Sequence, residues 1–241
     1  MIIMYIDLYT GIKIPVSFII INSKSQIAYE KVLEDFYRII TNNNTIPIGL
    51  QSYTIDYEIA LENSLKKIFI NAKHVGCFFH YIQCLIRWLK KNGYGSNEYK
   101  KSNEEIVYLL TIILFKYKSN MKYIEKTILN MKKTYPDYEI FYDYYEKNWY
   151  KYLESGVLDY TKITKLQRCN SYLENYNKII QNTLGKIAKI SWPKFITFIK
   201  EQESFYTKKI IETEKTTSLN GLKFTKFKNY ENKQSINIII I

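Results

Sequence analysis

Arginine is scarce in this chain, because 35 basic residues include only three arginines, Arg38, Arg87 and Arg168. Lysine therefore carries almost all of the positive charge. The formal net charge of +12 favours a polyanionic partner, since basic side chains neutralise phosphates and release counterions. Arginine would be the stronger sign of such a partner, because its planar guanidinium binds phosphate with two hydrogen bonds. A lysine excess beside many Ile, Asn and Tyr residues is also typical of an AT-rich coding sequence, and both explanations stay open.

Cysteine and long apolar runs are lacking as well. The three cysteines, Cys77, Cys84 and Cys169, form no regular framework, and their odd number fits a reducing compartment. The start of the chain is apolar but has neither a basic leader nor a small-residue cleavage site. The longest apolar run elsewhere, 107–115, is too short to span a bilayer. We therefore expect an intracellular protein without a membrane partner.

The first third of the chain predicts alternating strands and helices. At 241 residues, with 46% hydrophobic and 16% aromatic content, one domain is the simplest expectation. Apolar spacing and β-branched residues predict a hairpin, a helix, a strand, a second helix and a short strand. These lie at 1–21, 25–40, 50–55, 57–69 and 72–78.

The rest of the chain predicts helices. No strand pattern appears over 81–154, and helices are expected there as a unit beside the sheet. They lie at 81–91, 103–118, 121–133 and 136–153, and two more lie at 170–184 and 193–213. The three tryptophans fall in apolar helical patterns and are expected in the core. The Lys- and Asn-rich segment 216–241 is expected to be a weakly ordered tail with an exposed apolar end, which leaves 1–215 as the ordered domain.

Two motifs stand out. In the first, a strand ends in Asp56, a helix carrying Ala60 follows, and a short strand leads into Gly-Cys-Phe-Phe-His at 76–80. Gln83 and the pair Arg87 and Trp88 come next. The second motif, at 168–177, reads Arg-Cys-Asn-Ser-Tyr-Leu-Glu-Asn-Tyr-Asn.

In this order the two motifs closely resemble those of the Mutator-like element (MULE) transposase domain. The resemblance implies an α/β chain with an RNase H-like fold and a helical insertion, 81–154, between the second and third catalytic acids. It implies that Asp56 and Glu174 are these two acids, and we expect them to approach each other across the top of the sheet. Such enzymes hold Mg²⁺ or Mn²⁺ with carboxylates and transfer phosphoryl groups on DNA, which implies DNA as the partner and the nucleus as the location.

The first catalytic acid of that family has no counterpart here. In the family it lies on the opening strand, in an Asp-Gly-Thr-Phe-like stretch, whereas this chain starts at about the following strand. Asp7 belongs to that second strand, and no catalytic role is assigned to it. The chain is thus interpreted as a truncated or degenerate core of a cut-and-paste DNA transposase, and whether it is an enzyme stays open. The alternative is a non-catalytic DNA-binding or interaction protein that retains the fold. An edge left by the missing strand makes a homo-oligomer a further expectation.

Simpler roles stay open for the two acids. Asp56 lies between a strand and a helix, which is also the place of an ordinary N-cap. Glu174 lies opposite the apolar stripe of its helix, on one face with Asn170, Asn177 and Gln181. That face suits a cleft for metal and phosphate, and it equally suits a solvated helix surface.

The other motif residues have no assigned role. Cys77 and His80 have the spacing of half a zinc site, but a structural zinc needs four ligands. Packed core residues are the simpler interpretation, and zinc at this pair is not expected. Arg87 and Arg168 fit contacts to DNA phosphates, braces for the acids, or ion pairs on helix surfaces.

Overall fold

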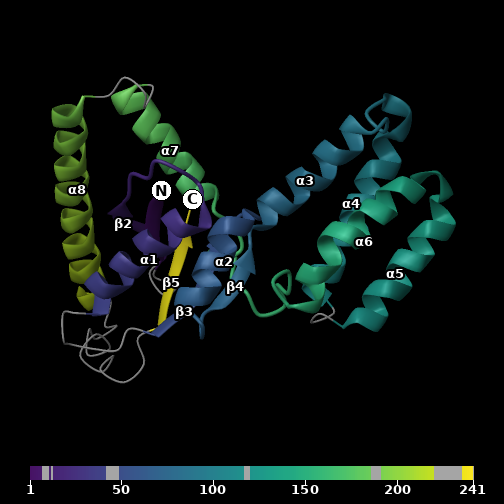
Figure 1. Cartoon of the computed structure of the whole chain (residues 1–241), viewed down its shortest axis with the longest axis horizontal. Coiled ribbons are helices and arrows are strands. Elements are labelled where there is room, and N and C mark those ends of the chain that lie inside the picture. The colour runs from purple at the N-terminus through teal and green to yellow at the C-terminus, as the bar shows by residue number, and fades with distance from the viewer. Residues whose placement is uncertain are drawn as a thin grey trace.

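The structure is a computed structural model that describes residues 1–6, 11, 13–41, 49–116, 120–185, 191–219 and 235–240 (Figure 1). It is mixed α/β and mostly helical, so the expected α/β class is confirmed. A sheet with helices on both faces forms one lobe, and a group of helices forms the other (Figure 1). No helix of the described ranges is long and apolar enough to cross a membrane.

The described sheet has five strands in the order β2-β1-β5-β3-β4. They are β1 (Ile2–Ile6), β2 (Lys13–Phe18), β3 (Gly49–Ile55), β4 (Lys73–Gly76) and β5 (Ser235–Ile240). β1 is antiparallel to both of its neighbours, and β3 is parallel to both β4 and β5. The carboxyl ends of β3 and β5 therefore lie at the same edge as the amino end of β1, and Asp56 follows β3 at this edge.

The last strand corrects the expectation of a weakly ordered tail over 216–241. Residues 235–240 form β5, in which Ile239 is paired with Met4 of β1 and with Thr54 of β3. A strand that is covered on both faces usually has a nearly continuous apolar sequence. The sequence Ser-Ile-Asn-Ile-Ile-Ile therefore fits the centre of a sheet better than an exposed end of the chain. β5 also fills the place where an open edge was expected, which removes that argument for a homo-oligomer. Residues 220–234 and 241 lie outside the described ranges.

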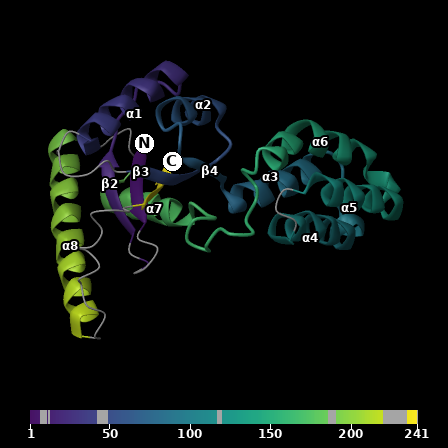
Figure 2. The ribbon, with the colours of Figure 1, turned by 90° about the horizontal axis from the view of Figure 1, so that it is seen from below.

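Helices cover both faces of the sheet (Figure 2). On one face, Ile3, Tyr53 and Ile55 pack against α1 (Gln26–Thr41) and α2 (Ile59–Ile68). On the other face, Ile2 and Met4 pack against α7 (Ser171–Leu184) and α8 (Trp192–Leu219). The alternation of Ile2, Ile3 and Met4 between the two cores follows from the period of two in a strand.

The second lobe consists of helices that pack on one another beside the sheet. They are α3 (Phe78–Lys91), α4 (Lys100–Lys116), α5 (Met121–Thr134) and α6 (Glu139–Glu154), with short 3-10 turns η1 (Asn97–Tyr99) and η2 (Pro136–Tyr138). Aromatic residues dominate their core, where the Tyr81 ring meets Trp149 edge to face and its hydroxyl bonds that of Tyr145 at 2.9 Å. Between 78 and 154 the described residues contain no strand.

One boundary differs from expectation at the first motif. The sequence placed 72–78 in a strand, but β4 ends at Gly76 and α3 begins at Phe78. The backbone N–H of Tyr81 already bonds the carbonyl of Cys77 at 3.0 Å, as the first turn of a helix requires. His80 therefore lies on the first turn of α3 and not beside a strand.

Candidate functional site

Asp56 lies just past the carboxyl end of β3, where α/β sheets usually place functional side chains. It is not the N-cap of the following helix, since Glu58 holds that position. Glu58 is itself bound by the Tyr29 hydroxyl at 2.8 Å and by Lys24 at 3.3 Å. The half-buried Asp56 carboxylate has no hydrogen-bond or ion-pair partner among the described residues, so it is available to a ligand.

A cavity of about 880 Å³ opens beside Asp56. Its walls come from the amino end of β1, the segment after β2, the starts of α1 and α2, and the facing parts of α7 and α8. The polar lining includes Asn177 and Gln181 of α7, which stand one and two turns after Glu174 on the same face. Asp56 thus faces the polar stripe of α7 that the sequence singled out.

The two sequence motifs meet in space, although Cys77 and Asn170 are 93 residues apart. The Cys77 thiol donates to Oδ1 of Asn170 at 2.9 Å, and both residues are fully buried. The Phe78 N–H donates to the Arg168 carbonyl at 2.8 Å. These bonds fix the start of α3 against the turn that leads into α7, so the motifs build one local structure.

Glu174 contacts His80 at this junction. Nε2 of His80 lies 3.3 Å from Oε1 of Glu174, and both side chains are partly exposed. Glu174 is therefore not simply a solvated charge on a helix surface. Nδ1 of His80 is buried and has no partner in the described structure. This contact places His80, at the start of α3, beside Glu174 in the first turn of α7.

The cysteines of the two motifs interact with each other. Interaction with the neighbouring Cys77 side chain lowers the pKa of Cys169. Burial opposes this shift, and hydrogen bonds from Ser171 add to it. The interaction between the two cysteines, together with burial, raises the pKa of Cys77. Cys77 is thus a packed core thiol, as the simpler interpretation held, and Cys169 is the more readily ionised partner.

The two motif arginines have different surroundings. Nε of Arg168 donates to the Ile163 carbonyl at 3.0 Å, and its guanidinium lies 4.8 Å from the centre of the Phe115 ring. Arg168 therefore braces the connection between α6 and α7 against α4. Arg87 is exposed on α3, where it donates to Oε1 of Gln83 at 2.7 Å.

The described residues do not fit a two-metal centre. They contain no group of three or more His, Cys, Asp or Glu side chains that could hold a metal ion. The resemblance assigns Asp56 and Glu174 as the acidic ligands for Mg²⁺ or Mn²⁺, and their approach across the top of the sheet stays a prediction. Asp7 lies outside the described residues.

The expected burial of the three tryptophans is wrong for one of them. Trp88 and Trp149 are packed among aromatic rings as expected, but Trp192 is 64% exposed and lines the cavity. The position of Trp192 directly before Pro193 could have indicated this exposure. It places Trp192 at the first turn of a helix, where a side chain has fewer neighbours.

Comparisons of the chain with protein-family models, with curated proteins and with solved structures find no match. The functional assignment therefore depends on the motifs and their geometry.

Proposed function

We propose that this chain is a degenerate core of a MULE-type DNA transposase, with an RNase H-like fold, that binds DNA and has little or no cleaving activity. The observation that carries the proposal is the meeting of the two motifs. A chance likeness in two separate stretches would not require Cys77 to bond Asn170 or His80 to contact Glu174. The motifs behave as parts of one site, which is what descent from a single catalytic centre implies.

The strand order supports the same ancestry. An acid that shares metals with Asp56 would have to stand on a strand next to β3. In the resembled family the hairpin formed here by β1 and β2 follows the strand that carries the first acid. That acid-bearing strand would then lie between β3 and β1. That central position, parallel to β3 and antiparallel to β1, is the one β5 occupies. Because β5 reads Ser-Ile-Asn-Ile-Ile-Ile, it brings no carboxylate.

A site with two acids predicts weak metal binding. Mg²⁺ loses its water reluctantly and needs well-placed oxygen ligands, so fewer fixed carboxylates hold it poorly. A misplacement of about 1 Å in a reacting group costs roughly a hundredfold in rate. The RNase H-like frame is thus retained while its chemistry is lost, and DNA binding is the function that remains.

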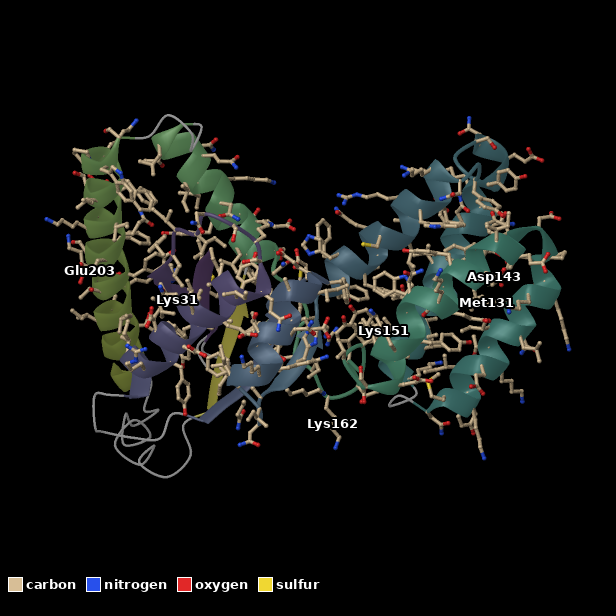
Figure 3. The ribbon with its side chains drawn as sticks, viewed as in Figure 1. Lys31, Met131, Asp143, Lys151, Lys162 and Glu203 are labelled. Atoms are coloured by element: carbon tan, nitrogen blue, oxygen red, sulfur yellow. The ribbon has the colours of Figure 1, made fainter. Side chains whose placement is uncertain are left out.

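The positive charge supports DNA as the partner. Binding through counterion release depends on the +12 net charge and not on catalytic geometry. Exposed lysines lie near the junction of the two lobes, where Lys151 is in the last turn of α6 and Lys162 projects from the connection that follows (Figure 3). A nuclear location belongs to this proposal. The rival function is a protein-interaction module that retains the fold, and it predicts no affinity for DNA.

The experiment incubates the purified chain with duplex DNA and Mg²⁺ or Mn²⁺, beside Asp56→Asn as the matched control. We expect binding that weakens steeply with salt, and no nicking above the control. Robust nicking that Asp56→Asn abolishes would show that the missing acid is supplied elsewhere, and the degenerate assignment would be wrong. Absence of binding at low salt would favour the interaction module.

A further inference from the structure

The cavity beside Asp56 has the size and place of a ligand site. Its volume of about 880 Å³ lies within the usual range for sites that enclose a small organic group. It opens beside Asp56, just past the carboxyl end of β3, and at the amino end of β1, which runs in the opposite direction. Crevices at such reversals in α/β sheets are where ligands bind.

One wall offers a flat aromatic surface. Trp192 is 64% exposed, and its ring meets that of Phe195 at 6.3 Å and 75°. Phe18 and Ile180 continue the apolar lining. An exposed indole beside an apolar recess suits a planar ring, because a base that stacks on it removes both faces from water.

The facing wall offers polar groups that match the edge of a base. Asn177 and Gln181 are four residues apart on α7, so both amides lie on one side of the helix. Neither amide has a hydrogen-bond partner within the described ranges. Asn and Gln amides pair with adenine through one donor and one acceptor, which makes adenine the best-matched base.

We propose that this cavity binds one unpaired nucleotide of a DNA end, with its base stacked on Trp192 and its edge at Asn177 and Gln181. The nucleotide must be unpaired, since a base inside a duplex offers neither a free face nor its pairing edge to a recess. The choice of DNA over a free nucleotide rests on the proposed function.

The test measures anisotropy of fluorescein-labelled duplexes in EDTA, so that no metal chemistry contributes. Blunt duplex is compared with duplexes that carry an unpaired adenine or thymine tail, and unlabelled AMP is added as competitor. Trp192→Ala removes the stacking surface, Trp192→Phe keeps a ring, and Phe205→Ala is the control. Phe205 is a 56% exposed aromatic on the same helix, outside the cavity lining.

The chain should bind tailed duplex more tightly than blunt duplex, and adenine tails more tightly than thymine tails. Trp192→Ala should weaken tailed binding by roughly five- to hundredfold and leave blunt binding unchanged. Trp192→Phe and Phe205→Ala should keep the preference, and Gln181→Ala should remove the preference for adenine. A chain without preference for tails, or a Trp192→Ala variant that weakens both duplexes equally, overturns the proposal.

Two further outcomes separate this proposal from the proposed function. Tail preference without any affinity for blunt duplex, with full competition by AMP, would assign the cavity to free nucleotides and overturn DNA as its source. Salt-sensitive binding of blunt duplex without tail preference would leave the DNA-binding function standing and refute the nucleotide site alone.

Discussion

Replacing Glu62 by glutamine tests how the helical lobe is joined to the sheet. Glu62 of α2 is 6% exposed and lies between three elements. It accepts hydrogen bonds from Lys66 at 2.6 Å and from the Tyr152 hydroxyl of α6 at 3.2 Å, and Nδ1 of His74 on β4 lies 3.6 Å away. Its charge therefore stabilises the contact between α2, β4 and α6.

The expected loss of folding free energy in Glu62→Gln follows from the pKa of Glu62. Burial raises this pKa, but the nearby His74 and the hydrogen-bonded Lys66 outweigh burial and lower it from 4.5 to about 2. The difference corresponds to about 3 kcal/mol of folding free energy. Because the Lys66 side chain is half exposed, water screens part of the interaction, and we expect about 2 kcal/mol. A pKa lowered on folding means that this stability is complete above about 4.5 and is lost as pH falls toward 2.

The assay is urea unfolding followed by circular dichroism from about pH 7 down to about pH 2. Glu62→Gln should unfold at lower urea at neutral pH, and the gap to the unchanged chain should close as the pH falls. Glu125→Gln is the control, since Glu125 is exposed on α5. A difference in urea midpoint that stays constant with pH would refute the reasoning. It would show that the loss of stability in Glu62→Gln comes from altered packing and not from the lost charge.

Three further predictions concern the first motif, the cysteines and β5. Gly76→Ala should lower the free energy of unfolding by about 1–3 kcal/mol, because a Cβ there would meet the Tyr57 hydroxyl at 2.7 Å, and adding Tyr57→Phe should recover part of the loss. Urea midpoints check this, and full stability of Gly76→Ala would contradict it. Iodoacetamide should modify Cys169 before Cys77, since the pKa of Cys169 is lowered and Cys77 is fully buried; peptide mapping that finds Cys77 first would be the contrary result. Ile239 of β5 is paired with Met4 and Thr54, so Ile239→Asp would add a carboxylate to the strand beside β3. This variant should show more metal-dependent nicking than a folded Ile239→Asn control. Equal activities would show that β5 does not occupy the position of the strand that carries the first acid.

The local parts of this structure could be predicted from the sequence. The strand before Asp56 and the helices around it follow from apolar spacing within a few residues. The contact between His80 and Glu174 could not be predicted, because it depends on how α7 packs on the sheet. The same holds for Trp192, whose exposure is set by the neighbours that its helix meets and not by its own pattern.

β5 shows most clearly where local reasoning ends. Its six residues, taken alone, fit a loose apolar tail as well as a strand, since a short apolar run carries no periodicity. What distinguishes the two is the place between β1 and β3, and β1 lies more than two hundred residues before β5 in the sequence. Because β1 and β3 each gain a hydrogen-bonded neighbour from β5, the sheet is continuous across its centre. β5 therefore completes the sheet between β1 and β3 without adding a carboxylate to it.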